Sequence, residues 1–398
     1  MAEWIECKIS DIGTVVGGAT PSTKKAENYE GGNIAWITPK DLSTFSGRYI
    51  KRGERNITEI GLKSCSTQLL PKNTVLFSSR APIGYVAIAA NEVCTNQGFK
   101  SVIPNEETDP LFLFYLLKHN KEKIEAMGSG TTFKEVSGNT MKNIIVRVPS
   151  DKEVQKNIAS ILGTLDDKIE ENERINNNLE QQAMALFKSW FIDYEPFDGQ
   201  VPSTWKYGVL GDFVEIKRGG SPRPIQNFLS DSGLHWLKIS DATGISSPFI
   251  SEIKEYIIEE GLKKTVFLKA GSLVLSNSAT PGLPKILDID TCIHDGWLYF
   301  PSSKFSNEYL YLYFKHIRDN LVALGNGSVF TNLKTDILKN YPTNLPTDEV
   351  LNEFDKIMKP IFSMILSTTR ESKRLTEIRD TLLPRLMSGE LDVSDIDL

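Results

Sequence analysis

The sequence has 398 residues, of which 40% are hydrophobic, so it has enough apolar material for two or three domain cores and is not wholly disordered. Its formal net charge of −6 argues against a sequence-blind binder of polyanions. The four cysteines form no CxxC pair, the first residues lack a signal-peptide pattern, and no apolar run reaches the length of a membrane span. We therefore expect a protein of the reducing cytoplasm.

The two halves of the sequence resemble each other in the same order. Trp36 in IAWITPKD corresponds to Trp236 in LHWLKISD, 200 residues later. Further pairs follow at similar displacements: LLPKNTVLFSSRAPIG with FLKAGSLVLSNSATPG, AMGSGTTF with ALGNGSVF, and KNIIVRVPSD with KNYPTNLPTD. Because chance similarity would not stay in register over so long a stretch, we infer an internal duplication.

Each copy begins with a pattern typical of a mixed α/β domain. Short β-branched runs between Gly, Pro and Asn predict strands, for example at 74–77 and 84–89. A longer segment with apolar residues on a helical period predicts a helix at 111–123. We expect the first domain to span residues 1–150 and the second to span residues 196–347.

A heptad-spaced apolar seam follows each domain, at residues 151–195 and 348–398. The predicted interface residues are Ile158, Leu162, Leu165, Ile169, Asn172, Asn176, Leu179 and Leu186 in the first seam, and Phe354, Met358, Ile361, Ile365, Thr368, Ser372, Leu375 and Leu382 in the second. Each residue of the second seam lies 196 positions after its counterpart, so both seams have a polar centre. We expect two long helices that pack on one another, the alternative being that each helix packs only on its own domain.

An antiparallel pair would bring Asn172 near Ser372 and Asn176 near Thr368, and buried Asn side chains would then fix the register. Pro360 should kink the second helix or mark its start.

The sequence predicts no catalytic residue and no metal ligand. It contains no P-loop, no GxGxxG after a strand and no HExxH. Asp212, Glu215 and Lys217 faintly resemble the carboxylates and lysine of a nuclease, but the first copy lacks this pattern.

Polar residues beside glycine at predicted turns are the candidates for DNA contact, because glycine lets the backbone approach closely while the side chains reach phosphates and base edges. In the first copy they are Thr20, Ser22, Lys24, Lys40, Ser79, Arg80, Asn96, Gln97, Thr131 and Lys134. In the second copy they are Arg218, Ser221, Arg223, Lys238, Asn277, Ser278, His294, Asn326, Ser328 and Lys334. The alternative for any one turn is that its glycines only end a strand.

This layout of domain, long helix, domain and long helix resembles the specificity (S) subunit of type I restriction-modification systems. The segments LFSSRAPIGYVAI, TNQGFK and GSGTTFK are similar to signatures of its target-recognition domains. The segments LEQQAMALFKSWFIDYEPF and IRDTLLPRLMSGEL resemble the family's central and C-terminal conserved regions. The resemblance covers essentially the whole chain.

The resemblance implies an α+β fold, with two similar mixed α/β target-recognition domains separated by a pair of long antiparallel coiled-coil helices. Each domain would read one half of a bipartite, asymmetric double-stranded DNA site, and the helices would set the spacer and dock two modification (methyltransferase) subunits. Restriction (translocase and nuclease) subunits would complete the complex. S-adenosylmethionine, ATP and Mg would bind to partner subunits, whereas this chain would bind no cofactor, catalyse no reaction and need no second copy of itself.

Two observations qualify these expectations. The second copy has Ser276-Asn277-Ser278 where the first has Ser78-Ser79-Arg80, so a contact by Arg80 does not transfer to the second domain. The excess acid lies in the two helical segments, whereas both domains are mildly basic, which predicts weak DNA binding by the isolated chain. A stand-alone nuclease or methyltransferase and a coiled-coil scaffold with two protein-binding domains remain the alternatives.

Overall fold

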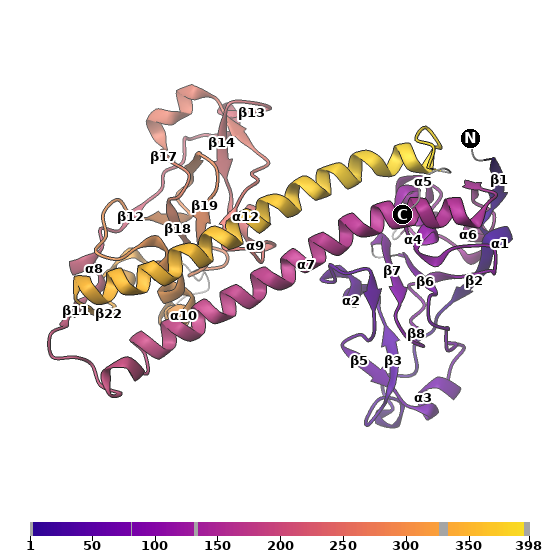
Figure 1. Cartoon of the computed structure of the whole chain (residues 1–398), viewed down its shortest axis with the longest axis horizontal. Coiled ribbons are helices and arrows are strands. Elements are labelled where there is room, and N and C mark those ends of the chain that lie inside the picture. The colour runs from indigo at the N-terminus through magenta and orange to yellow at the C-terminus, as the bar shows by residue number, and fades with distance from the viewer. Residues whose placement is uncertain (1–2, 81, 131–133, 326–332, 394–398) are drawn as a thin grey trace. The chain divides into compact units, whose positions relative to one another are not determined.

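Two helices of 40 residues each, α7 (Lys152–Phe191) and α12 (Asp348–Met387), are the longest elements of the computed structural model (Figure 1). The structure describes residues 3–80, 82–130, 134–325 and 333–393. α12 runs without interruption through Pro360, so this proline does not mark the start of the helix.

The chain divides into two units, which we call unit 1 (residues 1–170 and 373–398) and unit 2 (residues 171–372). Each unit contains one copy of the sequence repeat and a part of both long helices. The boundaries of the units therefore differ from those of the four segments expected from the sequence, because each long helix contributes to both units.

A five-stranded mixed sheet is the centre of unit 1, with the strand order β2-β9-β6-β7-β4. Its strands are β2 (Gly13–Gly17), β9 (Lys100–Pro104), β6 (Val75–Ser79), β7 (Ile83–Ala89) and β4 (Tyr49–Ile50). Every residue of β6 is buried, because Val75 and Phe77 pack into one core and Leu76 packs into another on the opposite face. A strand that is covered on both faces does not need to alternate polar and apolar residues, and β6, with the sequence VLFSS, begins with three apolar residues in a row.

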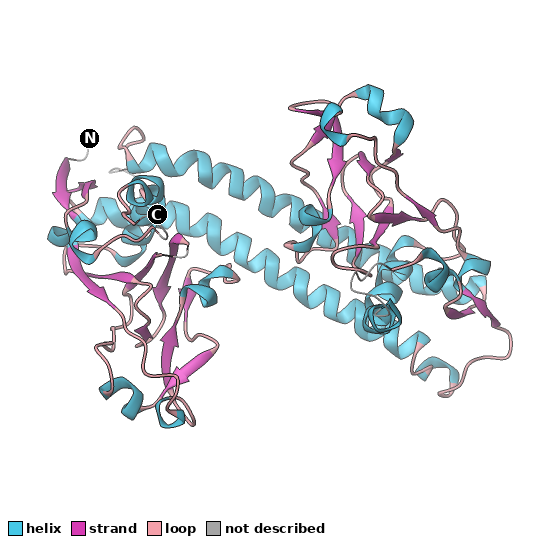
Figure 2. Ribbon diagram, turned by 180° about the vertical axis from the view of Figure 1, so that it is seen from behind, coloured by secondary structure: helices cyan, strands magenta, loops and turns pink. Residues whose placement is uncertain are grey.

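Smaller elements complete unit 1. A three-stranded sheet has the order β5-β3-β8, and a two-stranded sheet pairs β1 with β10. Their bounds are β5 (Arg55–Ile57), β3 (Ile34–Ile37), β8 (Cys94–Thr95), β1 (Trp4–Lys8) and β10 (Ile145–Pro149). The helices are α1 (Ile9–Ile12), α2 (Pro39–Ser43), α3 (Glu59–Lys63), α4 (Pro110–His119), α5 (Lys121–Ala126) and α6 (Gly138–Lys142). The apolar α4 packs on β6 and β7 of the five-stranded sheet. Figure 2 shows the strands of both units in magenta and the helices in cyan.

Unit 2 repeats this topology, with two added strands in its smaller sheet. Its five-stranded sheet has the order β12-β21-β18-β19-β15, and a two-stranded sheet pairs β11 with β22. The bounds are β12 (Lys217–Arg218), β21 (Trp297–Tyr299), β18 (Leu273–Ser276), β19 (Pro284–Leu287), β15 (Phe249–Ile250), β11 (Lys206–Val209) and β22 (Pro342–Leu345). The counterpart of the three-stranded sheet has the order β13-β16-β14-β20-β17, so one strand is added at each edge. The duplication inferred from the sequence is thus present in the tertiary structure.

The remaining elements of unit 2 also follow the repeat. The strands of the smaller sheet are β13 (Leu229–Ser230), β16 (Tyr256–Ile257), β14 (Leu234–Leu237), β20 (Thr291–Ile293) and β17 (Val266–Leu268). The helices are α8 (Leu210–Phe213), α9 (Ile239–Thr243), α10 (Asn307–Gly325) and α11 (Thr335–Lys339). α10 packs on β18 and β19, as α4 packs on β6 and β7.

Within each unit, α7 and α12 run antiparallel and share the core of the domain. In unit 1, Ile158 and Leu162 of α7 belong to the same buried cluster as Leu383 and Leu386 of α12. In unit 2, Phe187 of α7 joins a buried cluster with three predicted seam residues of α12, which are Phe354, Met358 and Ile365. The seams therefore pack on one another and also on the domains.

Candidate nucleic-acid interface

The polar centre of the helix pair lies in unit 2. The side-chain amide of Asn172 is fully buried and donates a hydrogen bond of 2.8 Å to Glu371 Oε2, one residue from the predicted neighbour Ser372. Asn176 accepts a hydrogen bond from the Thr368 hydroxyl and donates one of 3.3 Å to Thr369 Oγ1. These bonds hold α7 and α12 at one antiparallel register.

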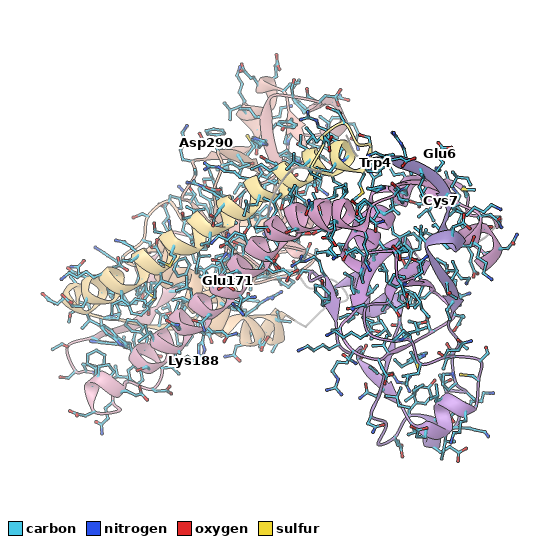
Figure 3. The ribbon with its side chains drawn as sticks, turned by 45° about the vertical axis from the view of Figure 1, so that its right-hand side comes forward. Trp4, Glu6, Cys7, Glu171, Lys188 and Asp290 are labelled. Atoms are coloured by element: carbon cyan, nitrogen blue, oxygen red, sulfur yellow. The ribbon has the colours of Figure 1, made fainter. Side chains whose placement is uncertain are left out.

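The other predicted interface residues lie along the same helices. Ile158, Leu162, Phe354, Met358 and Ile365 are buried, whereas Leu165, Ile169, Leu179, Leu186, Ile361, Leu375 and Leu382 are half-buried. Figure 3 shows the side chains that project from α7, among them Glu171 and Lys188.

Polar turns project from the domain of each unit, and the turn 96–98 of unit 1 follows strand β8. The backbone N–H of Gly98 donates a hydrogen bond of 2.9 Å to Oδ1 of Asn96, which closes the turn. The carbonyl of Gly98 accepts a hydrogen bond of 2.7 Å from the N–H of Ser79 at the end of β6. Gln97 is exposed at the tip, where Oε1 accepts a hydrogen bond from the Thr20 hydroxyl.

The turn 294–296 of unit 2 has the same construction with different side chains. The N–H of Gly296 donates a hydrogen bond of 2.7 Å to Nδ1 of His294, and the N–H of Asn277 donates one of 2.8 Å to the Gly296 carbonyl. At the tip, Oδ1 of Asp295 accepts a hydrogen bond of 2.7 Å from the Ser221 hydroxyl. Asn96 and His294 therefore close their turns, whereas Gln97 and Asp295 are presented outward.

A glycine lets the neighbouring loop approach each turn. A Cβ built on Gly18 would lie 2.2 Å from the carbonyl oxygen of Thr95, and one built on Gly219 would lie 2.3 Å from the carbonyl oxygen of His294. Both distances are far below van der Waals contact, so a side chain at either position would push the hydroxyl of Thr20 or Ser221 away from its partner. The glycine-rich runs of the sequence thus bring two loops together.

The chemical states of His294 and Asp295 follow from their surroundings. Burial lowers the pKa of the His294 imidazole, which is therefore neutral at pH 7. Since Nδ1 accepts the hydrogen bond from Gly296, the ring proton is assigned to Nε2. The hydrogen bond from Ser221, supported by the charge of Arg218, lowers the pKa of Asp295, which is therefore a carboxylate.

Most candidate cations are paired with a carboxylate. In unit 2, Arg223 Nη2 lies 3.3 Å from Asp295 Oδ2, and Arg218 Nη2 lies 3.9 Å from the same oxygen. Lys238 pairs with Glu255. The backbone carbonyl of Asp295 also accepts a hydrogen bond from Nε of Arg218.

The same holds in unit 1. Lys40 Nζ lies 2.7 Å from Glu54 Oε2, and Arg80 Nη1 lies 3.8 Å from Glu135 Oε2. Lys100 Nζ lies 3.2 Å from the other oxygen of Glu135. Among the described residues, three candidates make no ion pair: Lys24, Lys134 and Lys334.

A cavity of about 840 Å³ adjoins the turn 294–296 in unit 2. Its walls combine apolar side chains, such as Trp236 and Ile239, with the polar side chains of Arg223, Lys238 and His294. A hollow lined by both apolar and cationic side chains suits the edge of a nucleobase better than it suits a phosphate alone.

The predicted DNA-contact residues differ in exposure. Eight are exposed: Ser22, Lys24, Lys40, Gln97, Lys134, Arg218, Arg223 and Lys334. Seven are half-buried: Thr20, Arg80, Asn96, Ser221, Lys238, Ser278 and His294. Three lie outside the described residues: Thr131, Asn326 and Ser328.

Ser79 and Asn277 do not fit the prediction of DNA contact. Both are buried, and their side chains donate hydrogen bonds of 3.2 Å to backbone carbonyls, Ser79 to Gly98 and Asn277 to Asp295. They occupy the same position in the repeat and hold the same turn in place. We therefore remove both from the set of proposed contacts.

Several residues that shape these sites were not among the predicted contacts. Glu135 pairs with Arg80 and Lys100. Trp36 Nε1 donates a hydrogen bond of 3.1 Å to the carbonyl of Ala19 and so supports the loop that carries Thr20. The signal for Asp295 was available, because Asp295 aligns with the candidate Gln97. No sequence pattern marked Glu135, which meets Arg80 only through the fold.

Comparison with known proteins identifies the family. The family described as Type I restriction modification DNA specificity domain matches residues 1–181 and 202–378. The chain belongs to this family. It is 35% identical to the type I restriction enzyme MjaIX specificity subunit of Methanocaldococcus jannaschii, in an alignment that covers 99% of this chain and 95% of the relative.

Two further specificity subunits are similar along their whole length. The type I restriction enzyme HindI specificity subunit of Haemophilus influenzae is 25% identical, over 98% of this chain and 100% of the relative. The crystal structure of a type I restriction-modification S subunit from M. genitalium shares the fold, with a TM-score of 0.62 at 17% identity over 97% of this chain and 96% of that chain.

Membership of the family fits the non-catalytic role that the sequence predicts for this chain. Among the described residues, no group of three His, Cys, Asp or Glu side chains is placed to hold a metal ion. No helix in the described part of the chain is long and apolar enough to span a membrane.

Proposed function

We propose that this chain is the DNA-reading subunit of a cytoplasmic type I restriction-modification complex, in which each unit reads one half of a bipartite, asymmetric site in double-stranded DNA. The observation that carries the proposal is the pair of corresponding turns, 96–98 and 294–296. They have the same backbone hydrogen bonds but present different side chains. A duplicated scaffold with altered tips is what two readers of different sequences require.

The long helices supply the second part of the proposal. The buried amide of Asn172 and the paired Asn176 and Thr368 fix one register, so that α7 and α12 can act as a spacer of set length between the two half-sites. The acidic side chains of these helices repel phosphates and would keep the spacer off the DNA. We propose that two modification subunits dock on the helices and domains, and that restriction subunits join this assembly.

The cofactors in this proposal belong to the partner subunits. S-adenosylmethionine would bind to the modification subunits, which methylate adenine, while ATP and Mg would bind to the restriction subunits. This chain would bind none of them. A stand-alone nuclease based on Asp212, Glu215 and Lys217 is not favoured, because Glu215 Oε1 lies 2.8 Å from Lys217 Nζ in an exposed ion pair, whereas Asp212 accepts a hydrogen bond from the N–H of Val209.

Methylome mapping tests the proposal. The chain is produced with its cognate modification subunit in a host that lacks adenine methylation, and methylated adenines are mapped genome-wide. We expect a two-part motif with a fixed gap, lost when this chain is omitted. A continuous motif, or methylation that is independent of the chain, would contradict the proposal. Purified chain alone with Mg or S-adenosylmethionine should show no activity, and activity lost on Glu215→Ala would support the rival enzyme.

A further inference from the structure

The two corresponding turns present chemically different groups at equivalent positions. In unit 1, the loop and the tip of the turn carry Gly17, Thr20, Ser22 and Gln97, none of which is charged. The equivalent positions of unit 2 carry Arg218, Ser221, Arg223 and Asp295. The hydroxyl-to-tip hydrogen bond is common to both clusters, so the difference lies in the tip and in the two arginines beside it.

We propose that these two clusters select the base at equivalent positions of the two half-sites. Gln97 reads an adenine in the half-site of unit 1, and Arg223, positioned by Asp295, reads a guanine in the half-site of unit 2. This inference rests on the proposed function, since it assigns bases to the DNA-reading surfaces.

The geometry in unit 1 suits adenine. The Thr20 hydroxyl donates to Oε1 of Gln97, which fixes the side-chain amide, and among the described residues its NH₂ group makes no hydrogen bond. Oε1 keeps a second lone pair, so Gln97 can accept from N6 of adenine while it donates to N7, which is the bidentate pairing that glutamine makes with this base. Gln97 is exposed, so no side chain has to move to admit the base.

The geometry in unit 2 suits guanine. Arg223 has 80% of its side chain exposed and touches Asp295 through Nη2 alone. Because Nη2 carries two hydrogens, one can stay on Asp295 while the other, with Nη1, faces O6 and N7 of guanine. Asp295 in turn is held by Ser221, so the carboxylate is a positioning residue that restricts the guanidinium to one direction.

The cavity of unit 2 gives an independent reason to place a base edge here. Arg223 and Ser221 line it, together with Lys238 and His294. His294 contributes a single donor, the Nε2–H group, because Gly296 occupies Nδ1. The fork of Arg223 supplies a donor to each of the two guanine acceptors in the major groove, and Nε2–H of His294 can donate to the second lone pair of O6. These donors match guanine better than cytosine, whose N4 group is itself a donor.

Single substitutions in the complete complex test the assignment by methylome mapping. Arg223→Lys keeps the charge but removes the bidentate fork, so we expect the preference for guanine at one position of one half-site to fall about 10-fold or more while total methylation changes less. Asp295→Asn should weaken the same preference without replacing it. Gln97→Ala should relax an adenine in the other half-site only.

A matched control separates base reading from phosphate binding. Lys334 is exposed in the same unit and makes no ion pair among the described residues. Lys334→Ala should lower methylation about equally at all sites and leave the motif unchanged. Methylation that falls uniformly in Arg223→Lys, as in the control, would assign Arg223 to phosphate contact and overturn the proposal for unit 2.

Exchange of the clusters is the stronger test. The variant Gly17→Arg, Thr20→Ser, Ser22→Arg and Gln97→Asp gives unit 1 the cluster of unit 2. Gly17 accepts a side chain, because a Cβ there lies 4.0 Å from its nearest neighbour. We expect adenine to be replaced by guanine at that position. If the exchange variant does not assemble with its partners, the single substitutions still decide.

The outcomes distinguish the inference from the function on which it rests. A wild-type complex that yields no bipartite motif contradicts both. A bipartite motif that stays unchanged in Gln97→Ala and Arg223→Lys contradicts the assignment of bases and leaves the proposed function intact.

Discussion

Nη1 of Arg379 in α12 donates a hydrogen bond of 2.6 Å to Oδ1 of Asp166 in α7. The other oxygen of the same carboxylate accepts a hydrogen bond of 2.6 Å from the Tyr115 hydroxyl of α4. Asp166 therefore joins both long helices and the domain of unit 1 at one buried point, where 8% of its side chain is exposed.

This junction predicts a large loss of stability for Asp166→Ala. The change removes the hydrogen bond from Arg379, which keeps its pairing with Asp380, and leaves the Tyr115 hydroxyl without its acceptor, so the free energy of unfolding should fall by about 2–3 kcal/mol. Urea unfolding followed by circular dichroism measures it. Lys156→Ala, which breaks an exposed ion pair with Glu153 on the same helix, should cost far less. Equal losses in the two variants would contradict the role of the junction.

The polar centre of the helix pair predicts unequal effects for its two asparagines. Asn176→Ala removes hydrogen bonds to Thr368 and Thr369 and should lower the free energy of unfolding by about 1–2 kcal/mol. Asn172→Leu removes one hydrogen bond to Glu371 but also an Oδ1 atom that is buried without a hydrogen-bond partner among the described residues, so it should cost less than Asn176→Ala. Thermal unfolding of both variants checks the contrast, which a strong destabilisation by Asn172→Leu would contradict.

The buried Lys285 should make the free energy of unfolding depend on pH. Its ammonium group is buried and donates hydrogen bonds of 2.6 Å and 2.5 Å to the carbonyls of Ile245 and Ser247. Burial lowers its pKa to about 8 from the ordinary 10.5. Between these values the unfolded chain binds more protons than the folded protein, so this residue makes the free energy of unfolding rise with pH across that window.

The contribution is isolated by comparison with Lys285→Met, because tyrosines and cysteines with raised pKa values act in the opposite direction at alkaline pH. From pH 8 to 10.5 the wild-type protein should gain up to about 3 kcal/mol relative to the variant. Urea unfolding at a series of pH values measures this difference. Parallel pH profiles for the two proteins would show that the buried lysine does not titrate in this range.

The ion pairs of Glu135 should weaken the affinity of the free chain for DNA. Its carboxylate engages both Arg80 and Lys100, and Glu135→Gln would release them. Non-specific affinity for duplex DNA should rise, and the slope of log K against log salt should steepen by about 1 for each new phosphate contact. Fluorescence anisotropy over a range of salt measures both, with exposed Glu122→Gln on α5 as the control of equal charge. Identical behaviour of the two variants would refute the role of the ion pairs.

The helix pair predicts the spacing of the DNA site. Seven residues inserted in α7 after Glu170, matched by seven in α12 after Ser372, keep the seams in phase and lengthen the pair by about 10 Å. The gap between half-sites should grow by about three base pairs, with both half-sites unchanged. Methylome mapping gives the new gap. Altered half-site bases would show that the helices contribute to base reading.

The sequence by itself determined the large features of this protein. The nearly constant displacement between similar segments revealed the duplication, and the heptad spacing revealed two helices whose polar centres face one another. Both are repeating patterns of residue types along the chain, so they can be recognised without the tertiary structure. The alignment of the two copies also places Asp295 opposite Gln97, although only Gln97 was among the predicted contacts.

Only the tertiary structure decided which turn residues are available to a ligand. Ser79 and Gln97 both stand beside glycine in the sequence, yet the fold buries Ser79 against the turn that it supports and exposes Gln97. The ion pairs of Arg80 with Glu135 and of Arg223 with Asp295 join residues that are 55 and 72 positions apart. Such pairings arise from the approach of loops across the sheets, and no local pattern in the chain records that approach.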